Sequence, residues 1–282
     1  MDKRQIAIVT DSTADLKDEW IARYHIHVVP LDVIFGEQVF QDRVTLAPED
    51  FYRKLDETDL LPTTSQPSTA RFVEVFSALC AQNYVVIGIF ISAKLSGTYQ
   101  GALTAATMVQ GDITVFDSTT TTAALGMQVI EAAKMAEAGE DKNAILRRLD
   151  VMVGHMDAYI VLDTLEHLHR GGRIGGAAKF VGTLLQVKPI LYLKDGSVDV
   201  FAKVRTTRKA LDFLVDQVAK VCDGKQNVEI FVIYSLGADV EGYVATVSSR
   251  IPHATVHTTM IGPVVGNYAG SRSLGLVVHV ED

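Results

Sequence analysis

The chain has 282 residues, 48% hydrophobic and 21% charged, a composition typical of a globular protein with one large domain or two ordinary ones. Its formal net charge of −8 argues against a general binder of nucleic acid or of an anionic membrane surface, because such proteins carry an excess of basic residues. No apolar run reaches the roughly 18 residues of a membrane span, and the N-terminus lacks a signal-peptide pattern.

The cysteines are Cys80 and Cys222, and neither has a CxxC partner. Each lies in an apolar helical pattern, so we expect free buried thiols rather than a disulfide. A cytoplasmic location fits this cysteine usage.

Strands and helices alternate in the first half of the sequence. Apolar and β-branched runs predict strands at 6–10, 27–34, 85–91, 113–116 and 159–162. Helical spacing and first-turn signals predict helices at 15–24, 48–57, 69–82, 97–109, 122–138 and 143–153. This alternation is typical of an α/β domain with a mostly parallel, doubly wound sheet.

The second half has a different pattern. A β-hairpin is predicted at 189–204, with Asp195-Gly196 as its turn. The other elements predicted here are helices at 165–170, 177–185, 208–221 and 240–249, and strands at 228–234, 254–260 and 274–280. We therefore expect a second α+β domain with a mixed sheet. The boundary is placed within 155–163, giving an N-terminal domain at 1–160 and a C-terminal domain at 161–282 that pack closely.

Three strand ends of the first half carry Ser, Thr and Asp loops that open helices: DSTADL at 11–16, SAKLSGTYQGA at 92–102 and DSTTTT at 117–122. Ligands of open parallel sheets bind outside the carboxyl ends of the strands. The alternative is that these residues only cap helices. For Asp11 and Asp117 both interpretations stay open.

The helix start at Ser96, Gly97 and Thr98 is a candidate anion site. Glycine lets a ligand approach the backbone, the first amides of a helix are free donors, and the serine adds a hydroxyl. The sequence is not a phosphate-binding P-loop, because GxxxxGK[ST] does not occur.

The segment PTTSQPS at 62–68 offers a second set of hydroxyls without any ionisable group. Its two prolines stiffen the chain. It is either a simple turn or a loop that holds Thr64 and Ser65 toward the same anion as Ser96.

Basic residues gather at two places in the second half. Arg170 and Arg173 flank a glycine pair in LEHLHRGGRIGG at 165–176. They are either solvated residues at the end of a helix, or their guanidinium groups donate paired hydrogen bonds to a phosphate, a carboxylate or a partner protein. The second group consists of Lys203, Arg205, Arg208 and Lys209. It is either a solvated face or a docking surface for an acidic partner.

The sequence matches none of the common catalytic or metal-binding motifs that we considered. The sequence contains no GxSxG, no HExxH and no GxGxxG that opens a helix after a strand. His167 and His169 belong to no metal-ligand constellation. We therefore expect no metal and no cofactor, and favour a ligand carrier over an enzyme.

These motifs resemble the DegV family in order and spacing over essentially the whole chain: TDSTADL, TTSQPS, SAKLSGTYQGA, FDS, LEHLHRGGRIGG, KPIL and VRTTRKAL. The resemblance implies a two-domain α/β protein that binds one long-chain fatty acid and does not itself catalyse. Family members present the acid to a separate fatty acid kinase, which phosphorylates the carboxylate, and then hold the acyl phosphate for phospholipid synthesis.

The resemblance also assigns roles to residues. Thr64, Ser65 and Ser96 match the family's carboxylate ligands, with backbone help at Gly97 and Thr98. Arg173 and Arg205 match the family's kinase-facing or phosphate-facing positions. We expect Arg170 and Lys203, which lie near them in the sequence, to face a partner or phosphate as well.

One stretch departs from the family pattern. Where the family reads G-x-H-x-G-P-G, this chain reads GNYAGSR at 266–272. Tyr268 stands in place of the histidine; it can donate a hydrogen bond but carries no positive charge at neutral pH. Arg272 is expected to supply that charge if it points inward.

Three hypotheses stay open from the sequence. The first is a monomeric fatty acid carrier with a kinase partner, no nucleic acid partner and at most transient membrane contact. The second is an enzyme that acts on a small phosphorylated or carboxylated substrate. The third is a regulatory protein for which the ligand is a signal. Acyl chain length and saturation are not predictable from these residues.

Overall fold

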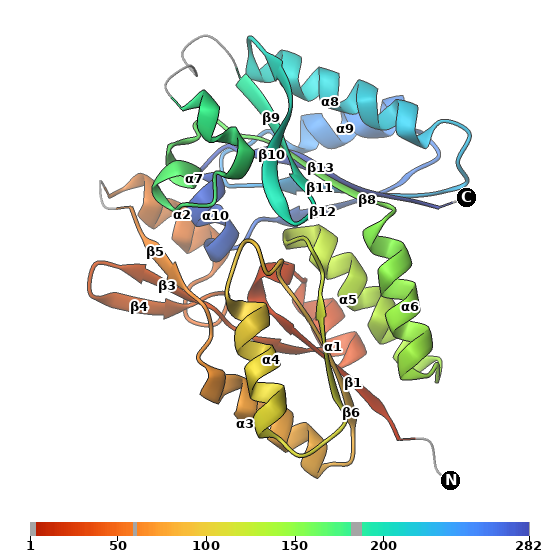
Figure 1. Ribbon diagram of the computed structural model, residues 1–282. Helices are drawn as coiled ribbons and strands as arrows, with labels where there is room; N and C mark the ends of the chain where they lie inside the picture. The colour runs from red at the N-terminus through yellow and green to blue at the C-terminus, as the bar shows by residue number, and fades with distance from the viewer. Residues whose placement is uncertain (1–3, 59–60, 182–187, 282) are drawn as a thin grey trace.

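The computed structural model describes residues 4–58, 61–181 and 188–281 (Figure 1). Its strands form a four-stranded, a three-stranded and a six-stranded sheet. Two α/β units result, one on each side of a shared core.

The first unit is built on a parallel sheet in the order β2-β1-β6-β7. Its strands are β1 (Ile6–Asp11), β2 (His27–Val29), β6 (Val85–Phe90) and β7 (Ile113–Asp117). Its helices are α1 (Asp18–Tyr24), α3 (Thr69–Ala81), α4 (Thr98–Met108), α5 (Thr122–Glu137) and α6 (Lys142–Val153), with a short 3-10 turn at Ser12–Ala14. Every residue of β6 is buried, because α3 and α4 cover one face and α5 covers the other. The predicted doubly wound parallel sheet is confirmed.

A small antiparallel sheet extends from this unit, in the order β4-β3-β5. It comprises β3 (Asp32–Phe35), β4 (Gln38–Gln41) and β5 (Thr63–Ser65), and α2 (Pro48–Asp56) packs beside it. The single strand predicted at 27–34 is wrong, because the chain leaves the parallel sheet at Pro30 and enters this sheet as β3. The PTTSQPS segment is also more than a turn, since β5 within it pairs Thr64 with Val33.

The second unit is built on a mixed sheet, as predicted, and the order of its strands is β10-β9-β8-β13-β11-β12. Only β11 and β12 pair in parallel among the described strands of this sheet. The strands are β8 (Met156–Val161), β9 (Lys188–Lys194), β10 (Ser197–Val204), β11 (Asn227–Tyr234), β12 (Thr255–Met260) and β13 (Leu274–Glu281). The helices are α7 (Glu166–Arg170), α8 (Thr207–Cys222), α9 (Val240–Arg250) and α10 (Pro263–Ala269), with a 3-10 helix at Gly175–Phe180. None of the helices that the structure describes could span a membrane.

Three details of this unit differ from or sharpen the sequence predictions. The predicted hairpin is confirmed, and its turn places Asp195 and Gly196 at φ 49° and 80°, which is typical of a type I′ turn. β8 was expected to close the first unit, but this was wrong, because β8 pairs with β13 and β9. The helix predicted at 177–185 is replaced by the 3-10 helix, and its residues 182–185 lie outside the described chain. The domain division at residue 160 stays a prediction.

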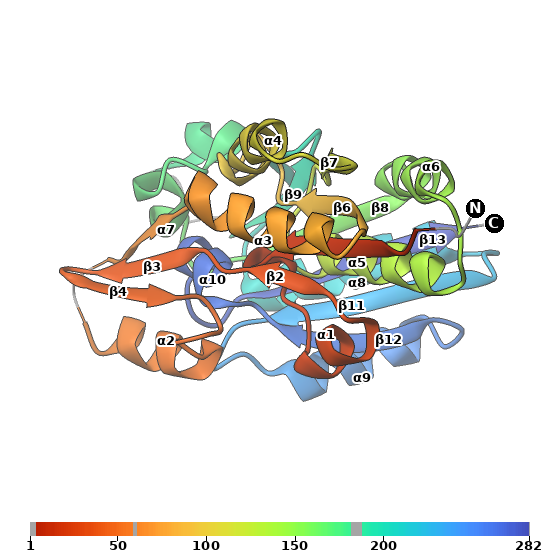
Figure 2. The ribbon, with the colours of Figure 1, turned by 90° about the horizontal axis from the view of Figure 1, so that it is seen from below.

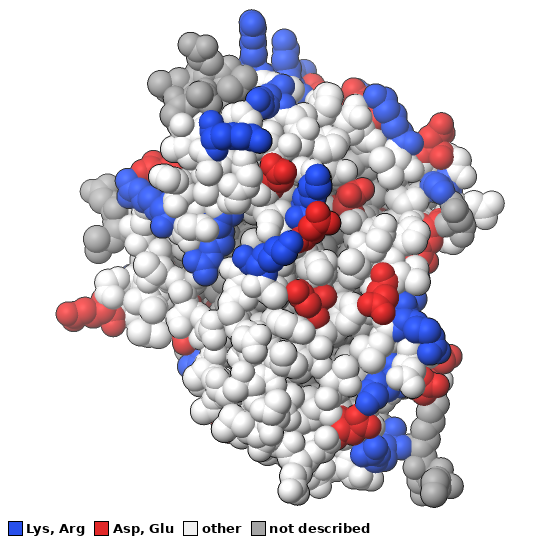
Figure 3. Space-filling view, in the orientation of Figure 1, with Lys and Arg blue, Asp and Glu red and all other residues white. Residues whose placement is uncertain are grey.

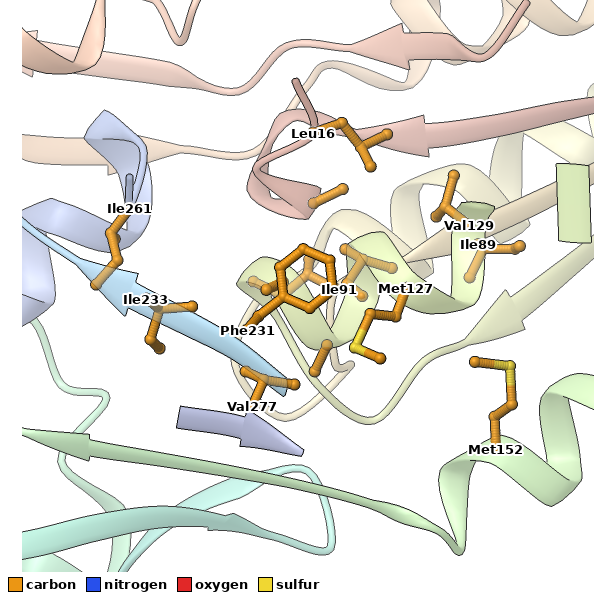
Figure 4. Close-up of a cluster of buried hydrophobic side chains, with 14 of the residues drawn as sticks. Leu16, Ile89, Ile91, Met127, Val129, Met152, Phe231, Ile233, Ile261 and Val277 are labelled. Atoms are coloured by element: carbon orange, nitrogen blue, oxygen red, sulfur yellow. The ribbon is translucent and has the colours of Figure 1, made fainter. Parts of the chain in front are cut away.

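The two units stack in layers (Figure 2). Helices α3 and α4 cover the parallel sheet, α5 lies between the two large sheets, and α8 and α9 cover the far face of the mixed sheet. Phe231 and Val277 of the mixed sheet lie beside Met127 of α5 in the core between the units, and Ile233 lies toward Ile261 (Figure 4). Both cysteines are free; Cys222 is buried and Cys80 is partly buried.

Candidate functional site

A cavity of about 350 Å³ lies where the carboxyl ends of the parallel strands meet the mixed sheet. This volume falls within the usual range for small-molecule sites, roughly 300–1,000 Å³. Most of the wall is aliphatic and comes from both units, as seen in Leu31, Ile91, Leu95, Ala158, Ile160, Leu162, Leu168, Leu191, Leu193, Val198, Ile233, Ile261, Val264, Val265 and Ala269. The polar wall residues are Thr64, Ser65, Gln66, Ser96, Thr121, Thr122, Tyr159, Arg173, Tyr192 and Tyr268, and Gly97 adds backbone.

The two hydroxyl loops identified in the sequence reach the same cavity. Thr64 of β5 shares a hydrogen bond of 2.6 Å with the phenol of Tyr268 on α10. Ser96 shares one of 2.9 Å with the hydroxyl of Thr98, and it accepts a second from the Thr98 amide at 3.3 Å. Thr98 itself is fully buried behind Ser96 and does not line the cavity. Ser65 is exposed at the cavity rim.

Gln66 is a wall residue that the sequence reasoning missed. A side chain at Gly97 would overlap its amide oxygen, so the glycine leaves room for Gln66 beside the start of α4. Gln66 stands directly between Ser65 and Pro67 in the PTTSQPS segment, and this position is the signal that could have identified it.

Arg173 places a cation at the same end of the cavity. Its Nε donates to the carbonyl of Leu95 at 3.0 Å and its Nη1 to that of Gly171 at 2.7 Å. Its guanidinium lies 5.3 Å from the centre of the Tyr268 ring, a cation–π arrangement. Arg173 is exposed, so its remaining donors stay available to a ligand or partner.

The other basic residues singled out in the sequence lie outside the cavity. Arg170 pairs with Glu166 one turn earlier, and the ammonium of Lys203 lies 3.9 Å from the centre of the Phe180 ring. Arg205 is exposed, and no contact of its side chain forms part of the site. Figure 3 shows Lys and Arg spread over the upper part of the molecule, whereas the surface over α4 is uncharged.

Arg272 is not among the residues that line the cavity. Its backbone has φ 60° in the turn after α10, and its amide donates to the carbonyl of Leu236 at 3.2 Å. This turn directs the exposed side chain toward Gly237 instead. Arg272 therefore supplies no charge to the cavity.

The loop after β1 joins the two units. Asp15 is buried, and its carboxylate accepts hydrogen bonds from Arg43 at 3.1 Å, Thr122 at 2.7 Å and the Gly262 amide at 2.9 Å. Burial raises the pKa of Asp15, and the Arg43 charge opposes that shift. Because Gly262 precedes α10, Asp15 fixes the helix that carries Tyr268.

Asp11 and Asp117 are loop organisers rather than ligands of the cavity. Asp11 accepts from the amides of Thr13 at 2.9 Å and Ile91 at 2.8 Å, so it caps the first turn and ties β1 to β6. Burial raises its pKa to about 6. Asp117 accepts from the amides of Thr119 at 2.9 Å and Ala93 at 3.2 Å. Asp11 therefore acts as a cap, whereas Asp117 organises its loop without capping a helix, because the N-cap of α5 is Thr121.

Asp42 is a second buried acid, close to Asp15. Burial, and then the charge of Asp15, raise its pKa to about 8. Ser12 lies close enough to oppose the shift, but neither carboxyl oxygen has a hydrogen bond of good geometry within the described chain. Asp42 is therefore largely protonated at neutral pH.

A second cavity of about 520 Å³ lies at the opposite end of β11. Arg148 of α6 bridges Glu131 of α5 and Glu281 of β13 in its wall, and His279 contacts Glu281 at 3.0 Å. None of the described wall residues is a site residue predicted from the sequence. No cluster of His, Cys, Asp and Glu able to hold a metal ion occurs in the described residues.

Comparison with known proteins gives the family. The family model described as "Uncharacterised protein, DegV family" matches residues 5–281. The chain belongs to the DegV family. A DegV domain-containing protein of Halalkalibacterium halodurans is 41% identical over 280 residues, covering 98% of this chain and 99% of that protein.

Solved structures of DegV proteins share the fold. The Bacillus subtilis DegV structure, described as a fatty acid binding protein, matches with a TM-score of 0.91 and 31% identity over 99% of this chain and 100% of that one. A stearic acid-binding protein of Eubacterium ventriosum matches with a TM-score of 0.89 and 28% identity, covering 98% of both chains. Both of these similar proteins are thus described as fatty acid binders.

Proposed function

We propose that this protein binds one long-chain fatty acid in the cavity of about 350 Å³, with the carboxylate at the hydroxyl end, and presents it to a fatty acid kinase. The observation that carries the proposal is the separation of apolar and polar residues in the cavity wall. Aliphatic side chains from both units form most of it, while Thr64, Ser96, Tyr268 and Arg173 gather at one end.

The aliphatic wall is suited to an acyl tail. A chain of about 16 carbons gains about 0.8 kcal/mol per buried methylene, roughly 12 kcal/mol before the costs of association. This wall favours a carrier over an enzyme for a small polar substrate, since such a substrate would leave the aliphatic surface unfilled.

The polar end needs only to satisfy the carboxylate. Hydroxyl donors from β5, α10 and the α4 loop prevent the penalty of a buried, unpaired carboxylate without fixing both of its oxygens. An oxygen left free is the atom that a kinase would phosphorylate with ATP. Arg173 is exposed at this end, and its guanidinium would stabilise the phosphate of the acyl phosphate product.

The test separates head-group contacts from tail binding. We expect Thr64→Ala and Ser96→Ala to slow acyl phosphate formation by a bacterial fatty acid kinase about tenfold, because each removes a donor to the carboxylate. Affinity for the fatty acid should fall less, since the tail provides most of it. Acyl phosphate is measured with ATP and radiolabelled fatty acid, and Thr107→Ala on the exposed face of α4 is the matched control. Unchanged acyl phosphate formation in both variants would show that these loops do not hold the head group.

A further inference from the structure

Three polar residues of the cavity wall are exposed: Ser65, Gln66 and Arg173. The other polar residues of this wall are partly or fully buried. Phosphorylation of a bound carboxylate would add a group with three further acceptor oxygens on the side from which a kinase approaches. The exposed residues are therefore the ones that such a phosphate would reach.

The backbone turns Gln66 toward the same side as Thr64. Thr64 lies in β5 and shares a hydrogen bond with Tyr268 in the cavity wall. Gln66 follows β5 directly, and residues two apart in extended chain face the same side. The hydroxyl of Ser65, on the other side, donates to the backbone carbonyl of Gln66 at 3.2 Å. Of the two exposed residues in this segment, Gln66 is thus the one whose side chain is free for a ligand.

The start of α4 leaves room for the Gln66 amide. A Cβ at Gly97 would overlap its Oε1, and a Cβ at Gly101, one turn later, would meet its Nε2 at 3.4 Å. The amide therefore lies against the first turn of α4, over backbone that carries no side chain. Gly97 is itself exposed and lines the cavity, so a ligand can reach this place.

Gln66 and Arg173 lie at neighbouring points of the loop that carries Ser96. The Nε of Arg173 donates to the carbonyl of Leu95, directly before Ser96, while the Gln66 amide lies against Gly97, directly after it. The Gln66 side chain makes no hydrogen bond to another described residue. Its amide can therefore turn its NH2 group toward an acceptor.

We propose that Gln66 binds the phosphate of the acyl phosphate, its NH2 group donating to one phosphate oxygen while the Arg173 guanidinium binds another. This inference rests on the proposed function and adds a residue that distinguishes product from substrate. The free fatty acid lacks these oxygens, and its carboxylate is held by the more buried hydroxyls. Gln66 would thus strengthen the binding of acyl phosphate without strengthening that of the free acid.

Two variants test Gln66 in different ways. Gln66→Met removes the amide but keeps the length of the side chain, and because the residue is exposed, the thermal unfolding midpoint should not change. Gly97→Ala keeps the amide but displaces it, and φ −72° at Gly97 is acceptable for alanine. Gln100→Met is the matched control, since Gln100 is exposed on α4 and does not line the cavity.

The experiment measures how two ligands displace a fluorescent fatty acid from protein stripped of lipid. One is stearic acid, and the other is a β-ketophosphonate in which a methylene group replaces the bridging oxygen of stearoyl phosphate, so that it does not hydrolyse. Gln66→Met should weaken the phosphonate roughly fivefold and change the affinity for stearic acid less than about twofold. Gly97→Ala should also weaken the phosphonate more than the acid, and Gln100→Met should bind both like the wild type.

Three results would overturn the inference while leaving fatty acid binding intact. They are equal losses of affinity for both ligands in Gln66→Met, which would assign Gln66 to the carboxylate, unchanged affinity of Gln66→Met for the phosphonate, and unchanged affinity of Gly97→Ala for it. A wild-type protein that binds neither ligand would overturn the proposed function, and the inference with it.

Discussion

Asp15 and Asp42 are two buried carboxyl groups that avoid the cost of an unpaired charge in different ways. Asp15 is satisfied on both oxygens by groups from the first unit and from the start of α10. Removing one partner of such a buried pair typically costs about 3–5 kcal/mol, because the other charge is left unpaired. Asp42 lacks such partners, so it avoids the cost by keeping its proton.

The raised pKa of Asp42 predicts a dependence of stability on pH. An unfolded chain releases this proton near the ordinary value of 3.8, whereas the folded protein releases it near pH 8. Between about pH 4 and pH 8 folding therefore takes up a proton, and the free energy of unfolding falls as pH rises. Asp42→Asn, which mimics the protonated acid, should reduce this fall and make the protein more stable than wild type at pH 8 by at least about 1 kcal/mol.

Urea unfolding at pH 5 and pH 8 measures both effects. Asp216→Asn, on the exposed face of α8, is the control and should leave the pH dependence unchanged. Identical pH dependence of Asp42→Asn and wild type would contradict the role assigned to Asp42.

At the scale of elements, the polar end of the cavity is assembled from four short segments. β5 carries Thr64, the start of α4 carries Ser96, α10 carries Tyr268, and the turn after α7 carries Arg173. Close approach of α7 and α10 depends on Gly171, because a Cβ there would overlap the Tyr268 ring. The ring has little room to move, since it is held by Thr64 and by the Arg173 guanidinium.

Gly171→Ala should therefore displace Tyr268 and weaken its hydrogen bond to Thr64. We expect a stability loss of about 1–3 kcal/mol from the overlap and a several-fold loss of fatty acid affinity, measured by displacement of a fluorescent fatty acid. Gly154→Ala is a close control: Gly154 also follows a helix, with φ −79° against −78° for Gly171, and a Cβ there meets only an ordinary contact at 3.5 Å. Equal fatty acid affinity of the two variants would show that the position of Tyr268 does not matter for the ligand.

The sequence predicted elements whose signals are local. The parallel sheet and the Asp195-Gly196 hairpin follow from periodicity and turn chemistry, and the loops that carry Thr64 and Ser96 were identified by their hydroxyls. Helix α10 was missed because seven residues give too little periodicity, even with Pro263 at its first position.

Features set by distant contacts could not be predicted in this way. The membership of β8 in the mixed sheet depends on β13, more than 100 residues later in the chain. The direction of the Arg272 side chain depends on the backbone conformation in the turn after α10. Side-chain direction at such turns is fixed by tertiary contacts and has no signature in a single sequence.

At the scale of the whole molecule, the cavity lies between the two units, and side chains of both units form its wall. Ile91 and Leu31 come from the first unit, while Ile160, Leu191 and Ile233 come from the second. An acyl chain between them would bury apolar surface of both units at once. Because a ligand that binds only the folded state stabilises it, fatty acid should raise the thermal unfolding midpoint of the whole chain.

The most direct test of fatty acid binding is mass spectrometry of the lipid released when the protein, purified from bacterial cells, is denatured. We expect close to one long-chain fatty acid per chain, because transfer of the tail from water into the apolar cavity is strongly favourable. Protein that releases no fatty acid, and that also takes up no added radiolabelled stearic acid, would contradict this account of the cavity.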